Sequence, residues 1–337
     1  MTPLKLNILA ESFIGKANGV YTAFVEAVEN LKKEPSIDLT INGKGHDFDV
    51  IHSHTIGLSY IRYALGRRKK MIVSAHVVPD SFIGSLIFST LWQPLAALYL
   101  KWVYNLSGMV IAVSPVVKTE LEKLGVRGRI EVLCNSVNRD KFKVNVLLRK
   151  QFREKWGLQD KDFVAVCVGQ IQPRKGVEDF IKTAKQCPDI RFVWVGGRPY
   201  GRLTADYATM TDLVDNAPAN VIFTDAVEFE DMPGFYAMSD VYFFPSYQEN
   251  FAFATIEASA VKLPLVLRDN PEYPSSLFTH YLKAQGPDGF ANCLQKLHLD
   301  PAFFQKWRRE SDLLAQQYEI KTYMKRLIQF YRDVAGH

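Results

Sequence analysis

The segment FVAVCVGQIQPRKGVEDFIKTA, residues 163–184, decides the fold class. Its first six residues form an unbroken apolar run, which is typical of a strand buried on both faces of a parallel sheet. A short turn follows Gly169, and Val177–Gln186 is expected to form a helix. The segment therefore predicts a strand, a basic turn and a helix, which is the repeating unit of a doubly wound α/β domain.

The same unit recurs along the 337 residues. Further helices are expected at 21–32, 116–124 and 255–261, each after a strand and a loop. A chain of this length exceeds one core, so two doubly wound domains are predicted. The other apolar runs are KLNILAE, FDVIHSH, KMIVSAH, GMVIAVS, RIEVLCNSV, RFVWVGG, NVIFTDA, DVYFFPS and LPLVLRD.

The boundary between the domains is expected near residues 143–150, where KVNVLLRKQFREKWGLQDKD reads as a charged helix that begins the second domain. We predict one Rossmann-like domain over residues 1–145 and another over 146–310, with a C-terminal helical segment, 311–337, that packs back on the first. Ligands of such sheets bind at the carboxyl ends of the strands, so a cleft between the two domains is the expected site.

Composition excludes several classes of protein. The chain is 47% hydrophobic and 23% charged, as in ordinary globular proteins. Cys134, Cys167, Cys187 and Cys293 are far apart and form no CxxC pair, and the N-terminus has no basic segment followed by an apolar run. Neither a disulfide framework nor a zinc site nor secretion is indicated, and a cytoplasmic chain with reduced thiols is expected.

Positive charge is concentrated in the first half of the chain. Residues 1–145 hold 18 Lys and Arg against 12 Asp and Glu, a balance of +6, whereas 146–337 hold 23 against 24, a balance of −1. This asymmetry favours an anionic partner for the first half, either nucleic acid or an anionic membrane. A solvated surface with no partner is the alternative.

Residues 81–100 contain no formal charge, a length that could just cross a bilayer. Polar residues and Pro94 interrupt the stretch, and a proline removes a helix hydrogen bond, so a membrane span is disfavoured. Two interpretations remain: a buried helix over 94–106, or an apolar face that lies on a membrane surface.

The turn of the opening segment has the features of an anion site. Arg174 and Lys175 precede Gly176 and the start of a helix, where backbone amides and the helix dipole favour a bound anion. A diphosphate fits such a site. A plain solvated basic turn is the alternative.

A second candidate cluster lies in YQENFAFATIEASA, residues 247–260, where Glu249 and Glu257 are eight positions apart. If a helix begins near residue 254, the amides of 250–253 point the same way as Glu249. One carboxylate then suits sugar hydroxyls and the other a ribose, since each has two acceptor oxygens. Two glutamates at this spacing are common, so the pair alone decides little.

Taken together, these segments resemble the retaining glycosyltransferases of the GT-B fold, the large group 1 family of nucleotide-sugar-dependent enzymes. The resemblance covers nearly the whole chain. It rests on NGVYTAFVEAVENL, FDVIHSHT, IVSAHVVPD, VIAVSPVVKTEL, IEVLCNSVNRDKF, VGQIQPRKG, WVGG, VIFTDAV and the spacing from Glu249 to Glu257.

The resemblance implies roles for individual residues. His76 and Glu249 are expected at the reacting sugar, His76 over its reacting face and Glu249 on the hexose. A core histidine hydrogen-bonded to the backbone is the alternative for His76, and His52 and His54 are expected to be structural. The other expected donor-binding residues are Gly19 in the first loop, Gly169 at the strand end, Arg174 and Lys175 on the diphosphate, Asn250, Phe251, Ala252 and Phe253 through their amides, and Glu257 on the ribose.

Three departures from the family pattern affect the donor site. Gln170 stands where an arginine is common, so one diphosphate cation is missing. The usual GFG after the first glutamate is here Asn250, Phe251 and Ala252, and without the glycines the loop has less backbone freedom. The first loop has ANG in place of GG, which leaves Gly19 alone.

The expected reaction is hexosyl transfer with retention. No side chain stands out as a nucleophile, so the departing phosphate oxygen is expected to help take the acceptor's proton while fixed cations stabilise the diphosphate. No metal-ligand motif is evident, so we expect a metal-independent enzyme that uses a UDP-hexose donor and no further cofactor.

The first domain is expected to bind the acceptor, and its charge and apolar stretch favour a membrane lipid. The narrower resemblance is to Gram-positive enzymes that glycosylate diacylglycerol or glucosyl-diacylglycerol, acting peripherally on the inner face of the cell membrane. Transfer to a soluble sugar or polysaccharide is one alternative, and a sugar- or nucleic-acid-binding module without activity is another. The predicted membrane-facing residues are Arg67, Arg68, Lys69, Lys70, Phe88, Leu91 and Trp92.

Overall fold

The computed structural model describes residues 2–11, 19–45, 47–82, 89–198, 206–251 and 253–336. The chain divides into two compact units. Unit 1 comprises Met1–Phe82, Thr90–Asn135 and Ile320–His337, and unit 2 consists chiefly of Ser136–Glu319. The expected C-terminal segment 311–337 is thus divided between the end of one helix in unit 2 and another helix in unit 1.

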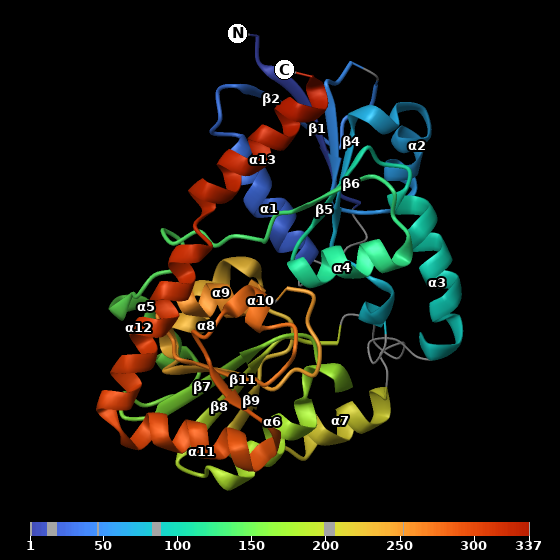
Figure 1. The fold of residues 1–337 in the computed structure, drawn as a ribbon. Helices are drawn as coiled ribbons and strands as arrows, with labels where there is room; N and C mark the ends of the chain where they lie inside the picture. The colour runs from blue at the N-terminus through green and yellow to red at the C-terminus, as the bar shows by residue number, and fades with distance from the viewer. Residues whose placement is uncertain are drawn as a thin grey trace. The chain divides into compact units, whose positions relative to one another are not determined.

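Unit 1 is built on a parallel sheet. Among the described residues it has six strands in the order β2-β1-β3-β4-β5-β6 (Figure 1). The strands are almost wholly buried except at the edges, as expected for a sheet covered on both faces. They are β1 (Leu4–Leu9), β2 (Ile37–Ile41), β3 (Val50–Ser53), β4 (Met71–Ala75), β5 (Met109–Ala112) and β6 (Arg129–Val132).

Local sequence explains where the helices of unit 1 begin and end. In α4, the Ser114 hydroxyl accepts a hydrogen bond from the Val117 amide, Pro115 occupies the first turn, and Gly125 ends the helix with φ of 83°. The helices of unit 1 are α1 (Gly19–Leu31), α2 (Leu58–Arg67), α3 (Ser89–Tyr104), α4 (Pro115–Leu124) and α13 (Ile320–Ala335), with short turns η1 (Arg68–Lys70) and η2 (Pro79–Phe82).

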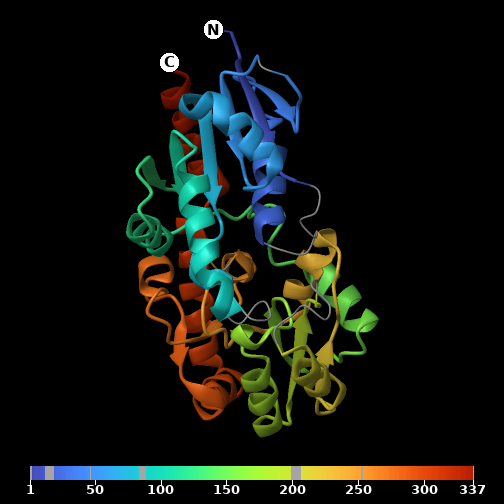
Figure 2. The same ribbon diagram turned by 90° about the vertical axis from the view of Figure 1, so that its right-hand side faces the viewer.

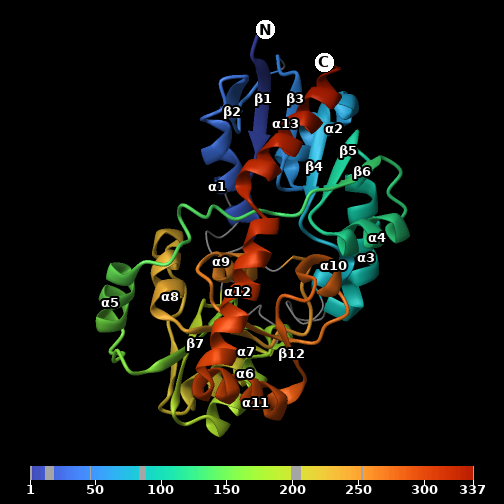
Figure 3. The ribbon, with the colours of Figure 1, turned by 60° about the vertical axis from the view of Figure 1, so that its left-hand side comes forward.

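The C-terminal helix α13 completes the core of unit 1. Met324, Leu327, Ile328 and Tyr331 lie on one face of this helix and pack against the sheet and α1. Figure 3 shows α13 crossing the sheet beside α1. The last sixteen helical residues are therefore part of the first unit's core, although they are far from it in sequence.

Unit 2 contains a second parallel sheet, with six described strands in the order β12-β11-β10-β7-β8-β9. Read from β9, this is the 3-2-1-4-5-6 order of dinucleotide-binding folds, with its switch point between β7 and β10. The strands are β7 (Phe163–Val168), β8 (Ile190–Val195), β9 (Val221–Phe223), β10 (Val241–Phe244), β11 (Leu265–Arg268) and β12 (Leu282–Ala284).

The helices of unit 2 include the predicted one at 177–186. They are α5 (Val146–Lys155), α6 (Val177–Gln186), α7 (Tyr207–Asp215), α8 (Met232–Met238), α9 (Phe253–Ala260), α10 (Pro274–Leu277), α11 (Gly286–Leu299) and α12 (Pro301–Gln317), with short turns η3 (Pro173–Lys175) and η5 (Phe229–Asp231). The prediction of two doubly wound parallel sheets is confirmed.

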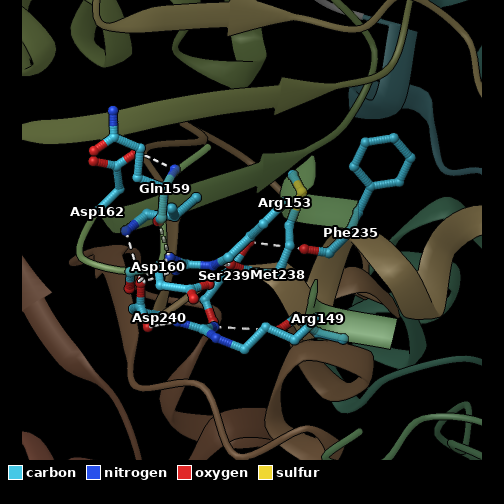
Figure 4. Close-up of polar contacts among 11 residues, drawn as sticks. Arg149, Arg153, Gln159, Asp160, Asp162, Phe235, Met238, Ser239 and Asp240 are labelled. Atoms are coloured by element: carbon cyan, nitrogen blue, oxygen red, sulfur yellow. Dashed lines mark hydrogen bonds and ion pairs between the residues drawn. The ribbon is translucent and has the colours of Figure 1, made fainter. Parts of the chain in front are cut away.

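A buried ion-pair network fixes α8 to the start of the second sheet (Figure 4). Arg153 is 1% exposed, and its guanidinium donates to the Met238 carbonyl at 2.9 Å and to the Asp240 carboxylate at 2.8 Å. Arg149 donates to the other oxygen of Asp240 at 2.7 Å, and the Val164 amide donates to Asp240 at 2.8 Å. The carboxylate thus joins α5, β7 and the end of α8, which carries a residue of the site below.

Candidate active site

The topology of unit 2 directs attention to the carboxyl ends of β7 and β10. Ligands of doubly wound sheets bind where the strand order reverses, which here is between these two strands. The turn after β7 carries Arg174 and Lys175, and the loop after β10 carries Glu249. The two predicted segments therefore meet at one edge of the sheet.

The turn after β7 depends on a glycine. Gly176 has φ of 77°, and a Cβ atom there would lie 2.3 Å from the Pro245 carbonyl oxygen. Any larger residue would push the turn away from the β10 loop, so glycine is required for the close approach. Helix α6 begins at Val177, directly after the two cations, and its N-terminus adds positive potential to the same edge.

Lys175 and Glu249 form a buried ion pair at this edge. The Lys175 ammonium contacts Glu249 Oε1, which lies 3.9 Å from Arg174 Nη1 and accepts from the Ser246 hydroxyl at 2.7 Å. Burial and the nearby Arg174 lower the pKa of Lys175 to about 8, although Glu249 acts to raise it. Burial acts to raise the pKa of Glu249, but Lys175 and Arg174 outweigh it and the pKa lies below its ordinary value. Both groups are charged at pH 7.

A second network holds the two segments in place. Arg268 contacts the Asp179 carboxylate and donates to the Pro245 carbonyl at 3.0 Å. The Tyr247 hydroxyl donates to the same aspartate at 2.9 Å, and the Tyr247 amide donates to the Arg174 carbonyl at 2.8 Å. Sequence reasoning missed Asp179 and Arg268, because nothing in the local pattern marks them.

Glu257 lies a turn inside α9 and is only 5% exposed. Its carboxylate accepts a hydrogen bond of 2.6 Å from the hydroxyl of Tyr236 on α8. Burial raises the pKa of Glu257 to about 7, against the lowering effects of Tyr236 and Lys141. Tyr236 was not identified from the sequence, where it stands in an unremarkable helical segment.

For the other predicted donor-binding residues, the structure describes fewer contacts. Phe251 packs against Phe253 and Tyr318, with ring centroids 6.0 and 5.5 Å apart. The Gly169 carbonyl accepts from the Trp194 indole at 2.8 Å. Asn250 lies in the same loop, whereas Ala252 lies outside the described residues.

Gln170, at the position where the family commonly has arginine, is tied to a neighbour. The side-chain amide of Gln172 donates to Gln170 Oε1 at 2.9 Å, and Gln172 is completely buried. Gln170 therefore has a fixed polar partner next to the cationic turn, but it adds no charge to it.

Gly19 and His76 belong to unit 1. Gly19 is the first residue of α1. His76 follows β4, and its Nε2 lies 3.3 Å from Nδ1 of His54, which follows β3. Burial lowers the pKa of His76 to about 4 and that of His52 to about 3. All three histidines are thus neutral at pH 7, because burial also lowers the pKa of His54.

The predicted membrane-facing residues also lie in unit 1. Arg68, Lys69 and Lys70 are exposed, while Arg67 and Trp92 are half-buried. Phe88 and the side chain of Leu91 lie outside the described residues.

Helix α3 has one exposed and one buried face. Leu95 is 70% exposed, Leu98 64% and Trp102 47%, whereas Leu100 and Val103 are buried. Figure 2 turns this helix toward the viewer. Across the described residues, no helix is both long and apolar enough to cross a bilayer.

Comparison with known proteins decides the family. Residues 149–311 match the group 1 glycosyl transferases, and residues 31–141 match glycosyltransferase family 4. Residues 149–311 form a group 1 glycosyltransferase domain. The Arg174, Lys175 and Glu249 cluster falls inside the first match.

Two bacterial relatives resemble this glycosyltransferase over most of its length. The alpha-galactosylglucosyldiacylglycerol synthase of Streptococcus pneumoniae is 28% identical, and the alignment covers 99% of this chain and 90% of the relative. The processive diacylglycerol alpha-glucosyltransferase of Acholeplasma laidlawii is also 28% identical, over 88% of this chain and 87% of the relative.

Solved structures share the fold of this glycosyltransferase. Anabaena HepE in complex with UDP-glucose superposes with a TM-score of 0.79 at 17% identity and covers 98% of this chain and 100% of its own. Sucrose-phosphate synthase from Thermosynechococcus elongatus gives a TM-score of 0.78 at 16% identity, over 98% and 99% of the two chains. The fold is GT-B, with two Rossmann-like domains, as predicted.

Proposed function

We propose that this glycosyltransferase moves a hexose from a UDP-sugar to glucosyl-diacylglycerol or diacylglycerol, with retention of configuration. One observation carries the proposal: a buried cationic turn and Glu249 meet at the switch point of a chain that matches lipid glycosyltransferases over nearly its whole length. The 99% coverage by the galactosylglucosyl-diacylglycerol synthase favours glucosyl-diacylglycerol as acceptor.

The donor half of the proposal rests on charge and position. Arg174, Lys175 and the start of α6 supply fixed positive potential where a diphosphate develops charge as it leaves. A structure of HepE, which shares the fold, contains UDP and glucose. Glu257 and Glu249 then bind the ribose and the hexose through their carboxylate oxygens.

Lys175 is held by Glu249 in a buried ion pair. Donor binding places an anion and sugar hydroxyls beside this pair, so each charged group gains a second partner. A preformed pair of this kind keeps both side chains ordered before the donor arrives, which lowers the entropy lost on binding.

Retention is supported by stereochemistry. Both bacterial relatives are named for alpha-linked products, and UDP-glucose and UDP-galactose are themselves α-linked donors. Transfer that keeps the α configuration is retaining. We propose front-face transfer in which the departing phosphate oxygen takes the acceptor's proton, because no carboxylate is assigned as nucleophile.

Metal independence and the absence of a further cofactor are part of the same proposal. The leaving diphosphate is stabilised by Arg174, Lys175 and the amides at the start of α6, which perform the charge-neutralising role that a divalent ion has in other transferases. Transfer should therefore be unchanged by a chelator of divalent ions.

The acceptor is proposed to reach the enzyme from an anionic membrane, on the inner face of the cell membrane. The exposed face of α3, formed by Leu95, Leu98 and Trp102, combines apolar and aromatic side chains at helical spacing. The exposed cations Arg68, Lys69 and Lys70 follow α2 and would attract anionic head groups, at about 1 kcal/mol each near the surface.

Vesicle binding tests the membrane part. Replacing Leu98 and Trp102 with serine should weaken co-sedimentation with anionic vesicles at every salt concentration, with donor binding intact. The control is Leu299→Ser, an even more exposed leucine on α11 of unit 2, which should bind as the parent does. Unchanged vesicle binding by the folded double variant would show that α3 does not contact the membrane.

A donor and acceptor screen tests the reaction itself. UDP-glucose, UDP-galactose and GDP-mannose are each combined with vesicles that contain diacylglycerol or monoglucosyl-diacylglycerol. The masses of the lipids are then measured by mass spectrometry. We expect a lipid one hexose heavier from a UDP-sugar. Transfer only to soluble sugars would replace the lipid proposal, and binding of UDP without any transfer would indicate a binding module.

A further inference from the structure

Three histidines form one cluster at the carboxyl ends of β3 and β4 in unit 1. The ring centroids of His52 and His54 are 4.6 Å apart, and those of His54 and His76 are 5.5 Å apart with an angle of 22° between the planes. His52 and His54 are buried. His52 and His54 were expected only to be structural, and their contacts show what each of them does.

His52 is explained by the fold. Its Nδ1 lies 2.8 Å from the Tyr331 hydroxyl on α13, and its Nε2 lies 2.9 Å from the Ser74 hydroxyl on β4. Both ring nitrogens thus have partners that can donate or accept. His52 joins β3, β4 and the C-terminal helix, and nothing about it requires a ligand.

His54 has an asymmetric environment. Its Nδ1 lies 3.3 Å from His76 Nε2, while its own Nε2 is buried without a hydrogen-bond partner. The ring is enclosed by other rings, because Phe24 packs edge-on at 5.8 Å and the rings of His52 and His76 lie at 4.6 and 5.5 Å. A turn of the side chain toward another partner would disturb this packing.

The unpaired nitrogen determines where the protons lie. The 3.3 Å contact between His54 Nδ1 and His76 Nε2 is a hydrogen bond, so one of these two nitrogens carries the shared proton and the other accepts it. If His76 donated, His54 would carry its proton on Nε2 and bury an unpaired N–H. If His54 donates, the unpaired Nε2 is only an acceptor. Orphaned buried N–H groups are the rarer of the two in proteins, so His54 is the donor.

We propose that His54 is a positioning residue that holds His76 in its Nδ1–H tautomer by donating from Nδ1 to His76 Nε2. The catalytic side of this inference rests on the proposed function and on the expectation that His76 lies over the reacting face of the hexose. In this tautomer the Nδ1 edge of His76 is its hydrogen-bond donor, suited to a sugar hydroxyl or a phosphate oxygen. The ring stays neutral, so it orients the sugar without supplying charge.

Nuclear magnetic resonance measures the tautomer directly. The full chain labelled with ¹⁵N in its seven histidines gives two-bond nitrogen–proton correlations that distinguish Nδ1–H from Nε2–H rings. His76 is assigned by the signal that His76→Gln removes. We expect His76 as Nδ1–H in the parent protein, and an Nε2–H pattern for His76 would overturn the inference whatever the enzyme's activity.

Two substitutions of His54 separate positioning from packing. His54→Asn keeps a donor nitrogen the same number of bonds from Cα as Nδ1, whereas His54→Gln moves it one bond farther, to the position of Nε2. We expect the Asn variant to keep the Nδ1–H signal of His76 and most of kcat. The Gln variant should lose that signal, with kcat lowered between about tenfold and a hundredfold and donor KM changed much less.

The outcomes separate this inference from the proposed function. Equal kcat and equal His76 signals in the Asn and Gln variants would overturn the positioning role. If the parent shows no sugar transfer at all, the proposed function fails, while the tautomer in the parent spectrum still decides the structural part. If the Gln variant does not fold, the parent spectrum and the Asn variant remain sufficient.

Discussion

Replacing Glu257 with glutamine should remove a pH-dependent cost from the folded protein. Glu257 is almost completely buried, and burial raises its pKa from an ordinary value of 4.5 to about 7. Between these two values the folded state binds more protons than the unfolded state. The free energy of unfolding therefore falls as pH rises from 4.5 to 7 and levels off above 7.

The size of this effect follows from the shift. Each unit of pKa difference is worth about 1.4 kcal/mol, so the parent should lose roughly 3 kcal/mol of stability between pH 4.5 and pH 8 through this one group. Glutamine has nearly the same shape, can still accept from the Tyr236 hydroxyl and does not ionise. The Glu257→Gln variant should therefore lose about 3 kcal/mol less stability than the parent over the same pH range.

Urea unfolding at pH 5 and pH 8, followed by fluorescence, measures the difference between variant and parent at each pH. The matched control is Glu230→Gln, an exposed glutamate of unit 2, which should follow the parent at both values. Between pH 5 and pH 8, the free energy of unfolding of Glu257→Gln should rise by roughly 2 to 3 kcal/mol relative to that of the parent. An equal difference at the two pH values would show that Glu257 is not held protonated by burial.

The remaining predictions concern the donor site. Lys175→Met should raise the Kd for UDP at least about tenfold, because a charge-assisted hydrogen bond is worth roughly 1.5–3 kcal/mol; calorimetry with an unchanged Kd would contradict this. Glu249→Gln removes the group that raises the pKa of Lys175, so this pKa should fall below about 8 and UDP affinity should decline as pH rises through 7, unlike in the parent. Tyr236→Phe removes a hydrogen bond that lowers the pKa of Glu257. The donor KM, which rises as the pH is lowered, should therefore begin to rise at a higher pH in this variant. An unshifted pH profile would show that Tyr236 does not influence the donor site.

The central strands could be predicted because their sequences reflect their burial on both faces of the sheet. FVAVCV and VYFF are apolar on both faces, as buried parallel strands must be. Two strands were missed, β2 (Ile37–Ile41) and β12 (Leu282–Ala284), and both are at the edges of their sheets. An edge strand has one neighbour and partial exposure, so IDLTI and LKA contain polar residues and give no apolar run.

The candidate site was predictable only in part, for a similar reason. Arg174, Lys175 and Glu249 lie in strand-to-helix turns with a recognisable order, and the structure brings them together. The partners that hold them, Asp179 and Arg268, are distant in sequence and meet only through the pairing of β10 with β11. A one-dimensional pattern contains no signal for such contacts.

The uncharged stretch shows a different limit. It was interpreted either as a buried helix or as a membrane face, and the described part of α3 has both kinds of surface. Leu100 and Val103 point inward, while Leu95, Leu98 and Trp102 are exposed. Since every one of these residues is apolar, hydropathy alone could not separate the two faces.

The central claim is tested most directly by the linkage in the lipid product. Enzyme, UDP-glucose or UDP-galactose, and vesicles containing monoglucosyl-diacylglycerol are incubated with a chelator of divalent ions, and the new glycolipid is purified. Proton magnetic resonance then reads the configuration at the transferred anomeric carbon. We predict a dihexosyl lipid with a new α linkage. A β-linked product would contradict retention, and a folded enzyme that binds UDP but forms no lipid product from either sugar would contradict the proposed transfer to glucosyl-diacylglycerol.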